Sequence, residues 1–125
     1  MTTDLEKALN DKRAPWTEIE YRTKDFWVFR DAYPVTQGHL LFVPTQESSN
    51  NLWECYKAAY KFGYDGVETA QWDGFNIGQN VGESAGQTVM YPHVHMIPRR
   101  TGDMPDPRGG VRHVIPKKGN YRVSK

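Results

Sequence analysis

The sequence predicts a single domain of the α+β class, in which strands flank a central helix. Short aromatic and β-branched runs, typical of strands, lie in the first third of the chain. From Asn51 apolar residues recur at helical spacing, and two more extended runs follow Trp72. The length of 125 residues suits one domain with a substantial core, and no internal repeat or linker divides it.

The N-terminal part is expected to hold one short helix followed by strands. Residues 4–13 have apolar side chains on one side and are followed by Pro15, as in a short amphipathic helix. Ile19 and Tyr21 alternate with charged neighbours, a pattern typical of strands. The next segments predict a strand, a turn and a buried strand that Pro44 ends: FWVFRD at 26–31, PVTQG at 34–38 and HLLFVP at 39–44.

A longer helix is expected to begin at Asn51. Gly63 and Gly66 are expected to weaken or break it, and residues 67–72 to carry it onward. We interpret its broad apolar stripe as core: Leu52, Trp53, Tyr56, Ala58, Ala59, Tyr60 and Phe62.

The last third of the chain is expected to be mainly extended. Residues 73–80 predict a strand, and residues 81–87 a Gly-rich loop too short for a long element. Residues 88–98 are again extended, because Pro92 disfavours a helix. After a segment rich in Pro, Gly and Arg comes a brief apolar run, VRHVIP.

Composition excludes several classes of protein. With 38% apolar and 25% charged residues the chain is not intrinsically disordered. It lacks the run of roughly 20 apolar residues that spans a membrane, and its charged N-terminus is unlike a secretory signal. Cys55 is the single cysteine, so a reducing, cytoplasmic location is expected. We expect neither membrane association nor, at a net charge of +1, direct nucleic-acid binding.

The charge is divided unevenly along the chain. Residues 1–98 carry 8 Lys/Arg and 13 Asp/Glu, a net of −5, whereas residues 99–125 carry 8 and 2, a net of +6. This basic end is either a solvated tail or a wall beside an anionic substrate, and composition does not decide between them.

Two histidines and the loop before them are the strongest candidates for chemistry. His93 and His95 lie two residues apart in an extended segment and therefore face the same side of a sheet. They could bind a metal with His39 or Asp31, act in nucleophilic catalysis, or simply face solvent. The small, polar loop at 82–88 has the composition of loops whose backbone N–H groups cradle phosphate.

Three segments together resemble the histidine triad (HIT) family of nucleotide hydrolases and transferases. They are FRDAYPVTQGHLLFVP at 29–44, GFNIGQNVGESAGQTV at 74–89 and PHVHMIPRRTGD at 92–103. The resemblance implies one HIT-like domain with an antiparallel sheet, usually dimeric. Its core would span about residues 16–103, and residues 104–125 would form a basic extension.

The resemblance also implies a mechanism. The middle histidine of the triad, His93, would attack the α-phosphorus of a nucleotide to give a covalent nucleotidyl-histidine, which water then resolves. The last one, His95, would hydrogen-bond a phosphate oxygen. The products would include a nucleoside monophosphate, and the substrate would be a purine dinucleoside polyphosphate, such as diadenosine tetraphosphate, or a nucleoside phosphoramidate. No cofactor or metal is implied, beyond a divalent cation accompanying a polyphosphate.

Further positions match the family's binding and supporting residues. Asp31 would bind the ribose, whereas Phe29 and Leu41 would line the base pocket. Asn80, Gln87 and Thr88 would contact phosphate and its bridging atom. A supporting set is expected at His39, Tyr91 and Gly86.

The chain departs from the family pattern at the first triad position, where Tyr91 replaces histidine. A neutral phenol can form a hydrogen bond but does not change protonation as an imidazole does. Because this position chiefly supports the middle histidine, activity is expected to survive. The Cys-x-x-Cys of some relatives is also absent.

Three alternatives stay open. The protein could be a nucleotide-binding module with weak or lost catalysis, a nucleotidyl transferase, or a metal-binding protein using His39, His93 and His95. The basic residues of the extension could approach the distal phosphates of a long substrate or form a dimer contact: Arg99, Arg100, Arg108 and Arg112.

Overall fold

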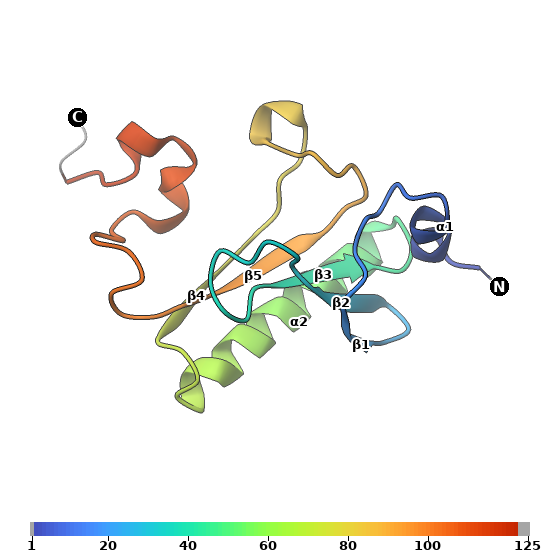
Figure 1. Ribbon diagram of the computed structural model, residues 1–125, viewed down its shortest axis with the longest axis horizontal. Helices are drawn as coiled ribbons and strands as arrows, with labels where there is room; N and C mark the ends of the chain where they lie inside the picture. The colour runs from blue at the N-terminus through green and yellow to red at the C-terminus, as the bar shows by residue number, and fades with distance from the viewer. Residues whose placement is uncertain (1, 123–125) are drawn as a thin grey trace.

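A computed structural model describes residues 2–122 and confirms the α+β class. It contains a five-stranded antiparallel sheet and two α-helices (Figure 1). The helices are α1 (Asp4–Asn10) and α2 (Ser49–Glu68). The strands are β1 (Ile19–Arg22), β2 (Phe26–Arg30), β3 (Leu40–Pro44), β4 (Gly74–Gly78) and β5 (Val94–Arg99).

The sheet order is β1-β2-β3-β5-β4, and every neighbouring pair is antiparallel. Strand β3 lies at its centre and is buried along its whole length. Its Leu41 is opposite Phe29 of β2 and opposite His95 of β5. This register brings residues from three distant parts of the chain side by side on one face.

Two hydrophobic clusters form on the two faces of the sheet. Alternate strand residues, including Val28, Phe42 and Met96, pack against α2. The residues between them, including Phe29 and Leu41, belong to a second cluster with α1. Because side chains alternate along a strand, His95 lies on the face opposite α2.

Helix α1 is shorter than the expected 4–13. Thr3 caps its N-terminus: the Thr3 hydroxyl accepts from the Glu6 N–H, and the Glu6 carboxylate accepts from the Thr3 N–H at 3.0 Å. The helix ends at Asn10, and Lys12 then adopts a left-handed backbone with φ of 64°. This turn directs the chain into β1.

Helix α2 begins before Asn51 and runs unbroken through both glycines, so the predicted weakening at these positions is wrong. The aromatic rings of Phe75 and Trp72 occupy the space that a Cβ atom would take on Gly63 and Gly66, respectively. The Trp72 indole N–H also donates to the Gly63 carbonyl at 2.8 Å. The glycines therefore serve close packing, and their low helix propensity is offset by tertiary contacts.

Two other expectations for this region fail. The helix ends at Glu68, and residues 69–72 form a turn instead of continuing it. The aromatic stripe is only partly core, because Trp53 and Tyr60 are 57% and 54% exposed. The residues of α2 that are fully buried are small, such as Cys55 and Ala59.

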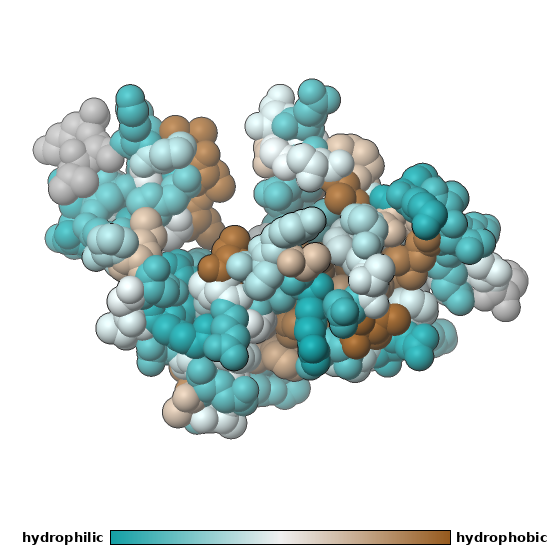
Figure 2. All heavy atoms as spheres, viewed as in Figure 1, coloured by the Kyte–Doolittle hydropathy of each residue, from teal (hydrophilic) through white to brown (hydrophobic). Residues whose placement is uncertain are grey.

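The C-terminal segment leaves β5 as an arm set apart from the sheet (red in Figure 1). It contains two short 3-10 helices, η2 (Gly110–Val114) and η3 (Pro116–Lys118). The apolar residues of its predicted run are exposed: Val111, Val114 and Ile115. Figure 2 shows apolar surface on the arm. Residues 123–125 of the expected extension lie outside the described residues. Within residues 2–122, no helix is long and apolar enough to cross a membrane.

Replacing Gly66 with Ala is expected to destabilise the protein, although Ala favours helix more than Gly does. The new methyl group would collide with the Trp72 ring. Overpacking of this kind costs about 1–3 kcal/mol, which exceeds the helix-propensity gain of about 1 kcal/mol. Urea denaturation measures the change. Gly74→Ala is the control, because nothing lies within 4 Å of a Cβ there, and an equal loss of stability in both variants would contradict this account.

Candidate active site

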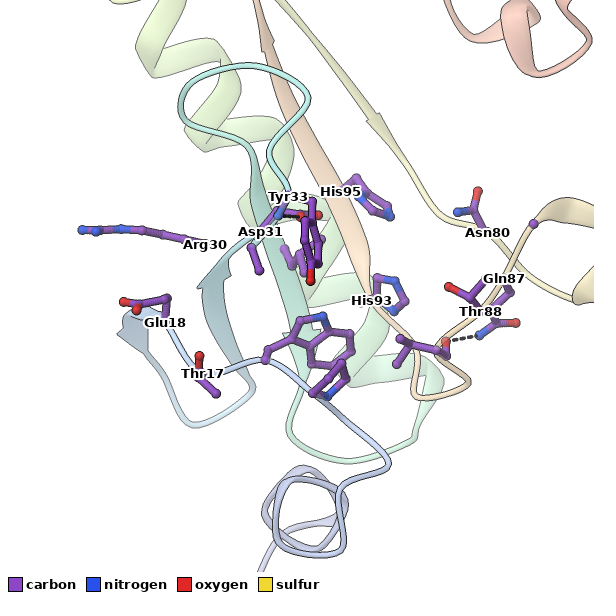
Figure 3. Close-up of a pocket in the computed structure, with 16 residues that line it drawn as sticks. Thr17, Glu18, Arg30, Asp31, Tyr33, Asn80, Gln87, Thr88, His93 and His95 are labelled. Carbon is purple, nitrogen blue, oxygen red and sulfur yellow. Dashed lines mark hydrogen bonds between the residues drawn. The ribbon is translucent and has the colours of Figure 1, made fainter.

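A pocket of about 410 Å³ lies on the face of the sheet opposite α2 (Figure 3). Eight of the residues predicted from the sequence line it: Asp31, Leu41, Asn80, Gly86, Gln87, Thr88, His93 and His95. Of the other three, Phe29 and Tyr91 lie in the core beneath, and His39 lies behind His95. The pocket thus gathers side chains from β2, β3, β5 and the loop before β5.

His93 is held in one tautomer by its backbone neighbour. Its Nδ1 lies 2.8 Å from the carbonyl oxygen of Tyr91, which can only accept a hydrogen bond. Nδ1 therefore carries the proton, and Nε2 carries the lone pair. The Trp16 and His93 rings pack edge to face, with 4.8 Å between ring centroids. His93 thus presents a fixed nucleophilic nitrogen to the pocket.

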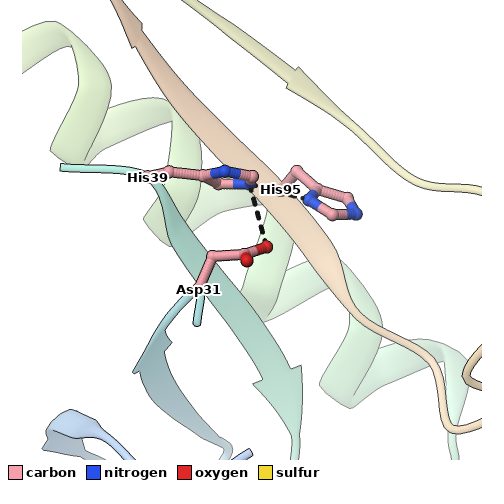
Figure 4. A group of neighbouring side chains, drawn as sticks. All are labelled: Asp31, His39 and His95. Atoms are coloured by element: carbon pink, nitrogen blue, oxygen red, sulfur yellow. Dashed lines mark hydrogen bonds and ion pairs between the residues drawn. The ribbon is translucent and has the colours of Figure 1, made fainter. Parts of the chain in front are cut away.

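His95 is held in the opposite tautomer through His39 (Figure 4). The His39 Nδ1 accepts from the Val35 backbone N–H at 3.2 Å, so the proton of a neutral His39 is on Nε2. The His39 Nε2–H points to His95 Nδ1 at 2.9 Å. The Asp31 carboxylate lies 3.4 Å from the same His39 Nε2. His95 Nδ1 is therefore an acceptor, and its Nε2–H is the donor left for a ligand.

Burial keeps the three rings neutral at pH 7. Desolvation, together with the neighbouring His93 and His39, lowers the pKa of His95 to about 4. Desolvation also lowers the pKa of His93 and of His39, outweighing in each the opposite effect of Asp31. A neutral His93 is the form that can attack phosphorus.

Asp31, His39 and His95 lie close enough to hold a metal ion, with one ligand atom from each inside 4.8 Å. This set has Asp31 in place of the His93 considered from the sequence. A metal ion there would need the His39 Nε2 lone pair, whereas the Val35 N–H fixes a proton on that atom. The donors present fit the hydrogen-bonded arrangement better than they fit a metal.

The glycine-rich loop uses most of its backbone donors within itself, which its composition does not suggest. It turns through η1 (Glu83–Ala85), with Gly82 and Gly86 at φ of 93° and 87°. Hydrogen bonds inside the loop use four of its N–H groups: those of Gly82, Ala85, Gly86 and Gln87. These four N–H groups are therefore not available to a ligand.

The Gln87 side chain is also committed to the loop. Its carbonyl oxygen accepts from Gly82 N–H at 2.8 Å, and its amide donates to the Val89 and Met90 carbonyls. Asn80 and Thr88 face the pocket beside it (Figure 3). Their side chains are the neutral donors on this side.

Tyr91 acts through its main chain. Its ring is 3% exposed within the second cluster, and its hydroxyl donates to the Pro44 carbonyl at 2.7 Å. Burial raises the pKa of this phenol well above its ordinary value. The side chain thus supports the fold, while the carbonyl orients His93.

Sequence reasoning missed the wall formed by the segment before β1 and by the end of β2. Trp16 packs over the buried Phe29 with 5.7 Å between ring centroids, and so covers the position expected to meet the base. The other missed lining residues include Thr17, Glu18, Arg30 and Tyr33. The aromatic Trp16 next to Pro15 is the only sequence signal, because no spacing links it to the histidines.

The arginines near the C-terminus do not reach this pocket. Arg99 is bound to Asp103 and Asn76, and Arg100 donates to the Gln37 carbonyl. Arg108 pairs with Asp106, and Arg112 donates to carbonyls of the arm. Within one copy of the chain, these contacts do not support the approach to distal phosphates, and the alternative of a dimer contact stays a prediction.

Comparison with known proteins assigns this architecture to a family. A family model described as the HIT domain matches residues 15–102. An uncharacterised HIT-like protein of Saccharolobus solfataricus is 31% identical over 112 residues, covering 83% of this chain and 77% of that protein. The asymmetrical bis(5'-nucleosyl)-tetraphosphatase of Schizosaccharomyces pombe is 30% identical over 94 residues, covering 70% of this chain and 52% of the yeast protein.

Solved structures agree with the fold. A zinc-bound histidine triad family protein from Mycobacterium smegmatis has a TM-score of 0.65 and 28% identity, covering 79% of this chain and 81% of that one. A hypothetical histidine triad nucleotide-binding protein from Sulfolobus tokodaii has a TM-score of 0.60 and 31% identity, covering 79% and 70%.

The histidine cluster is expected to make stability depend on pH between about 6.5 and 4. The folded pKa of His95 lies below its ordinary value of 6.5. As the pH falls through this window, the unfolded chain binds a proton that the folded chain does not, so folding is weakened. After allowance for solvent screening, His95 contributes a loss of about 1 kcal/mol from pH 7 to pH 5.

Urea denaturation at both pH values tests this dependence. His95→Asn should reduce the pH-dependent loss. A loss confined to pH below about 4 would instead implicate carboxylates such as Asp103, whose pKa is lowered from 3.8 to about 2 by its hydrogen bonds with Arg99.

Proposed function

The chain belongs to the HIT domain family, and we propose that it is a nucleotide hydrolase that releases a nucleoside monophosphate through a nucleotidyl-histidine intermediate. The observation that carries the proposal is the opposite tautomers of two adjacent imidazoles. His93 offers a lone pair and His95 offers a proton, each from Nε2. Their ring centroids are 5.2 Å apart in one pocket. A nucleophile beside a hydrogen-bond donor suits attack at a phosphoryl group.

In the first step His93 Nε2 forms a bond to the α-phosphorus. The bond from phosphorus to the bridging atom breaks, and its electron pair leaves with that atom. The resulting phosphorylated imidazolium is positively charged, and its Nδ1–H donates to the Tyr91 carbonyl at 2.8 Å. The His95 Nε2–H donates to a non-bridging oxygen, where negative charge accumulates.

In the second step water replaces the histidine. The water oxygen bonds to phosphorus and the P–N bond breaks, returning its electron pair to His93 Nε2. One water proton is released to solvent, and the product is a nucleoside monophosphate. His93 recovers the neutral tautomer in which it began, so the cycle closes.

The remaining lining residues divide between the parts of a nucleotide. Asp31 Oδ1 is fixed by the Tyr33 N–H at 2.8 Å, which places a carboxylate where ribose hydroxyls can donate to it. Trp16 and Leu41 offer apolar surface for the base. Asn80 and Thr88 are suited to the phosphates, and a divalent cation would enter only with a polyphosphate.

Two relatives bear names that favour dinucleoside polyphosphates as substrates. The fission yeast relative is a bis(5'-nucleosyl)-tetraphosphatase, and a Dictyostelium discoideum relative, 30% identical over 103 residues, is a bis(5'-adenosyl)-triphosphatase. The latter match covers 71% of this chain and 67% of that protein. We therefore place dinucleoside polyphosphates ahead of phosphoramidates for this chain.

We also propose that the protein acts as a homodimer through the β4 side of the sheet. β4 is an edge strand, so among residues 2–122 its outer backbone groups have no strand partner. Beside it, Tyr60 and Tyr64 of α2 pack on Phe75 yet remain 54% and 48% exposed. In a symmetric dimer, the β4 strands of two copies could pair through these backbone groups, and the exposed aromatic side chains of each copy would be covered by the other.

Release of AMP from diadenosine polyphosphates and from adenosine phosphoramidates tests the hydrolase. We expect His93→Asn to reduce turnover by at least about 1,000-fold, because the nucleophile is lost. His113→Asn, which removes a histidine of the arm, should keep turnover near wild type. If wild type binds nucleotides, as a shift in melting temperature would show, but releases no AMP, the protein is a binding module.

Tyr91→Phe is expected to lower the stability of the protein but to leave its turnover nearly unchanged. It removes the donor to the Pro44 carbonyl and should lower the free energy of unfolding by about 1 kcal/mol. The Tyr91 backbone carbonyl persists, so AMP release should change by less than a few-fold. Parallel urea denaturation and turnover assays measure both, with Tyr121→Phe, at an exposed residue of the arm, as the control. A large loss of turnover in a folded Tyr91→Phe protein would mean that the hydroxyl takes part in the chemistry.

A further inference from the structure

A second hollow adjoins the pocket that contains His93. It has a volume of about 490 Å³ and shares Pro15, Thr88 and Val89 with that pocket. Lys12, Arg13 and Glu47 are the charged residues that line it. We refer to it as the Lys12 groove. It lies between the segment after α1 and the segment before β5, so Thr88 stands where the two hollows meet.

Lys12 is the available cation of this groove. The Arg13 guanidinium is engaged by Asp11 at 3.0 Å. Among residues 2–122, no carboxylate lies within ion-pair distance of the Lys12 ammonium group. A lysine without an acidic partner beside a phosphate-transfer site favours an anionic ligand.

The backbone at Lys12 is unusual for a lysine. Its φ of 64° lies in the left-handed region, which helices reserve mostly for glycine just after their C-terminus. The turn is nevertheless firmly held, because the Ala14 N–H donates to the Ala8 carbonyl at 3.1 Å and Ala14 is 3% exposed. Glycine at this position would cause less backbone strain than lysine does. The turn therefore holds the Lys12 side chain at a fixed place despite that strain.

We propose that the Lys12 groove binds the leaving half of a dinucleoside polyphosphate, an inference that rests on the proposed hydrolase function. Attack by His93 sends the bridging oxygen, with the phosphates beyond it, away from the imidazole. Lys12 binds those phosphates, and the Glu47 carboxylate accepts from hydroxyls of the second ribose. Pro15, Val89 and the 61% exposed Met90 give apolar surface to the second base.

The groove would therefore select between the two substrate classes. A nucleoside phosphoramidate with a small amine has a leaving group that ends near Thr88 and leaves the groove empty. A dinucleoside polyphosphate fills both hollows. The binding energy of the leaving half is then available for one class alone.

The kinetic test compares kcat/KM for diadenosine tetraphosphate and adenosine phosphoramidate. Lys12→Gln should lower the ratio of the first to the second by roughly five-fold, as expected for one exposed charge contact. Lys12→Gly should lower it similarly while raising the urea midpoint, since glycine relieves the left-handed backbone. Lys24→Gln, a change at an exposed lysine in the β1–β2 turn, should leave the ratio unaltered. An unchanged ratio in both Lys12 variants would overturn the proposal.

A binding test makes the outcome independent of turnover. Calorimetry would compare His93→Asn with the double variant His93→Asn/Lys12→Gln, using diadenosine tetraphosphate and AMP as probes. Selective weakening of tetraphosphate binding supports the groove, even if wild type hydrolyses neither substrate and the hydrolase proposal fails. Equal affinities in the two proteins, or no binding of either probe, would refute the groove.

Discussion

The pairing of β3 with β5 is the constraint on which the rest of this structure depends. It joins the β1-β2-β3 half of the sheet to the β5-β4 half, and it sets Leu41 opposite His95. The same register brings His39, just before β3, against His95. A shift of one residue would turn His95 toward α2 and Met96 toward the pocket, because side chains alternate along each strand. Fold and chemistry are thus fixed by one set of backbone hydrogen bonds.

Much of the fold could be predicted because its signals are local. Strand runs, the helix period after Asn51 and the Gly-rich loop each depend on residues close in sequence. The predictions that failed concern helix ends, such as those of α1 and α2, and the packing of side chains against the helix. Gly63 and Gly66 suggest a break until Phe75 and Trp72 are seen to occupy the missing side-chain space. Helix propensity is weak compared with such packing.

The candidate site shows the same division. The residues of the motif segments meet in one pocket, but spacing along the chain does not show which donors are already used. Four N–H groups of the loop donate hydrogen bonds within the loop itself, and the Gln87 side chain also forms hydrogen bonds to its backbone. No spacing links Trp16 to its partner, because His93 lies far along the chain. Hydrogen-bond satisfaction is a property of the folded loop, and composition does not report it.

The Tyr91 carbonyl bears on how members of this family are recognised from sequence. Every amino acid provides a main-chain carbonyl, so the group that orients His93 imposes no requirement on the side chain at this position. The side chain at this position can therefore be one that suits the protein interior. Here it is a tyrosine, whose hydroxyl donates to the Pro44 carbonyl at the end of β3. A search pattern that insists on three alternating histidines would therefore discard chains that retain the working geometry. The informative signature is the pair at 93 and 95 together with His39, which sets the tautomer of His95.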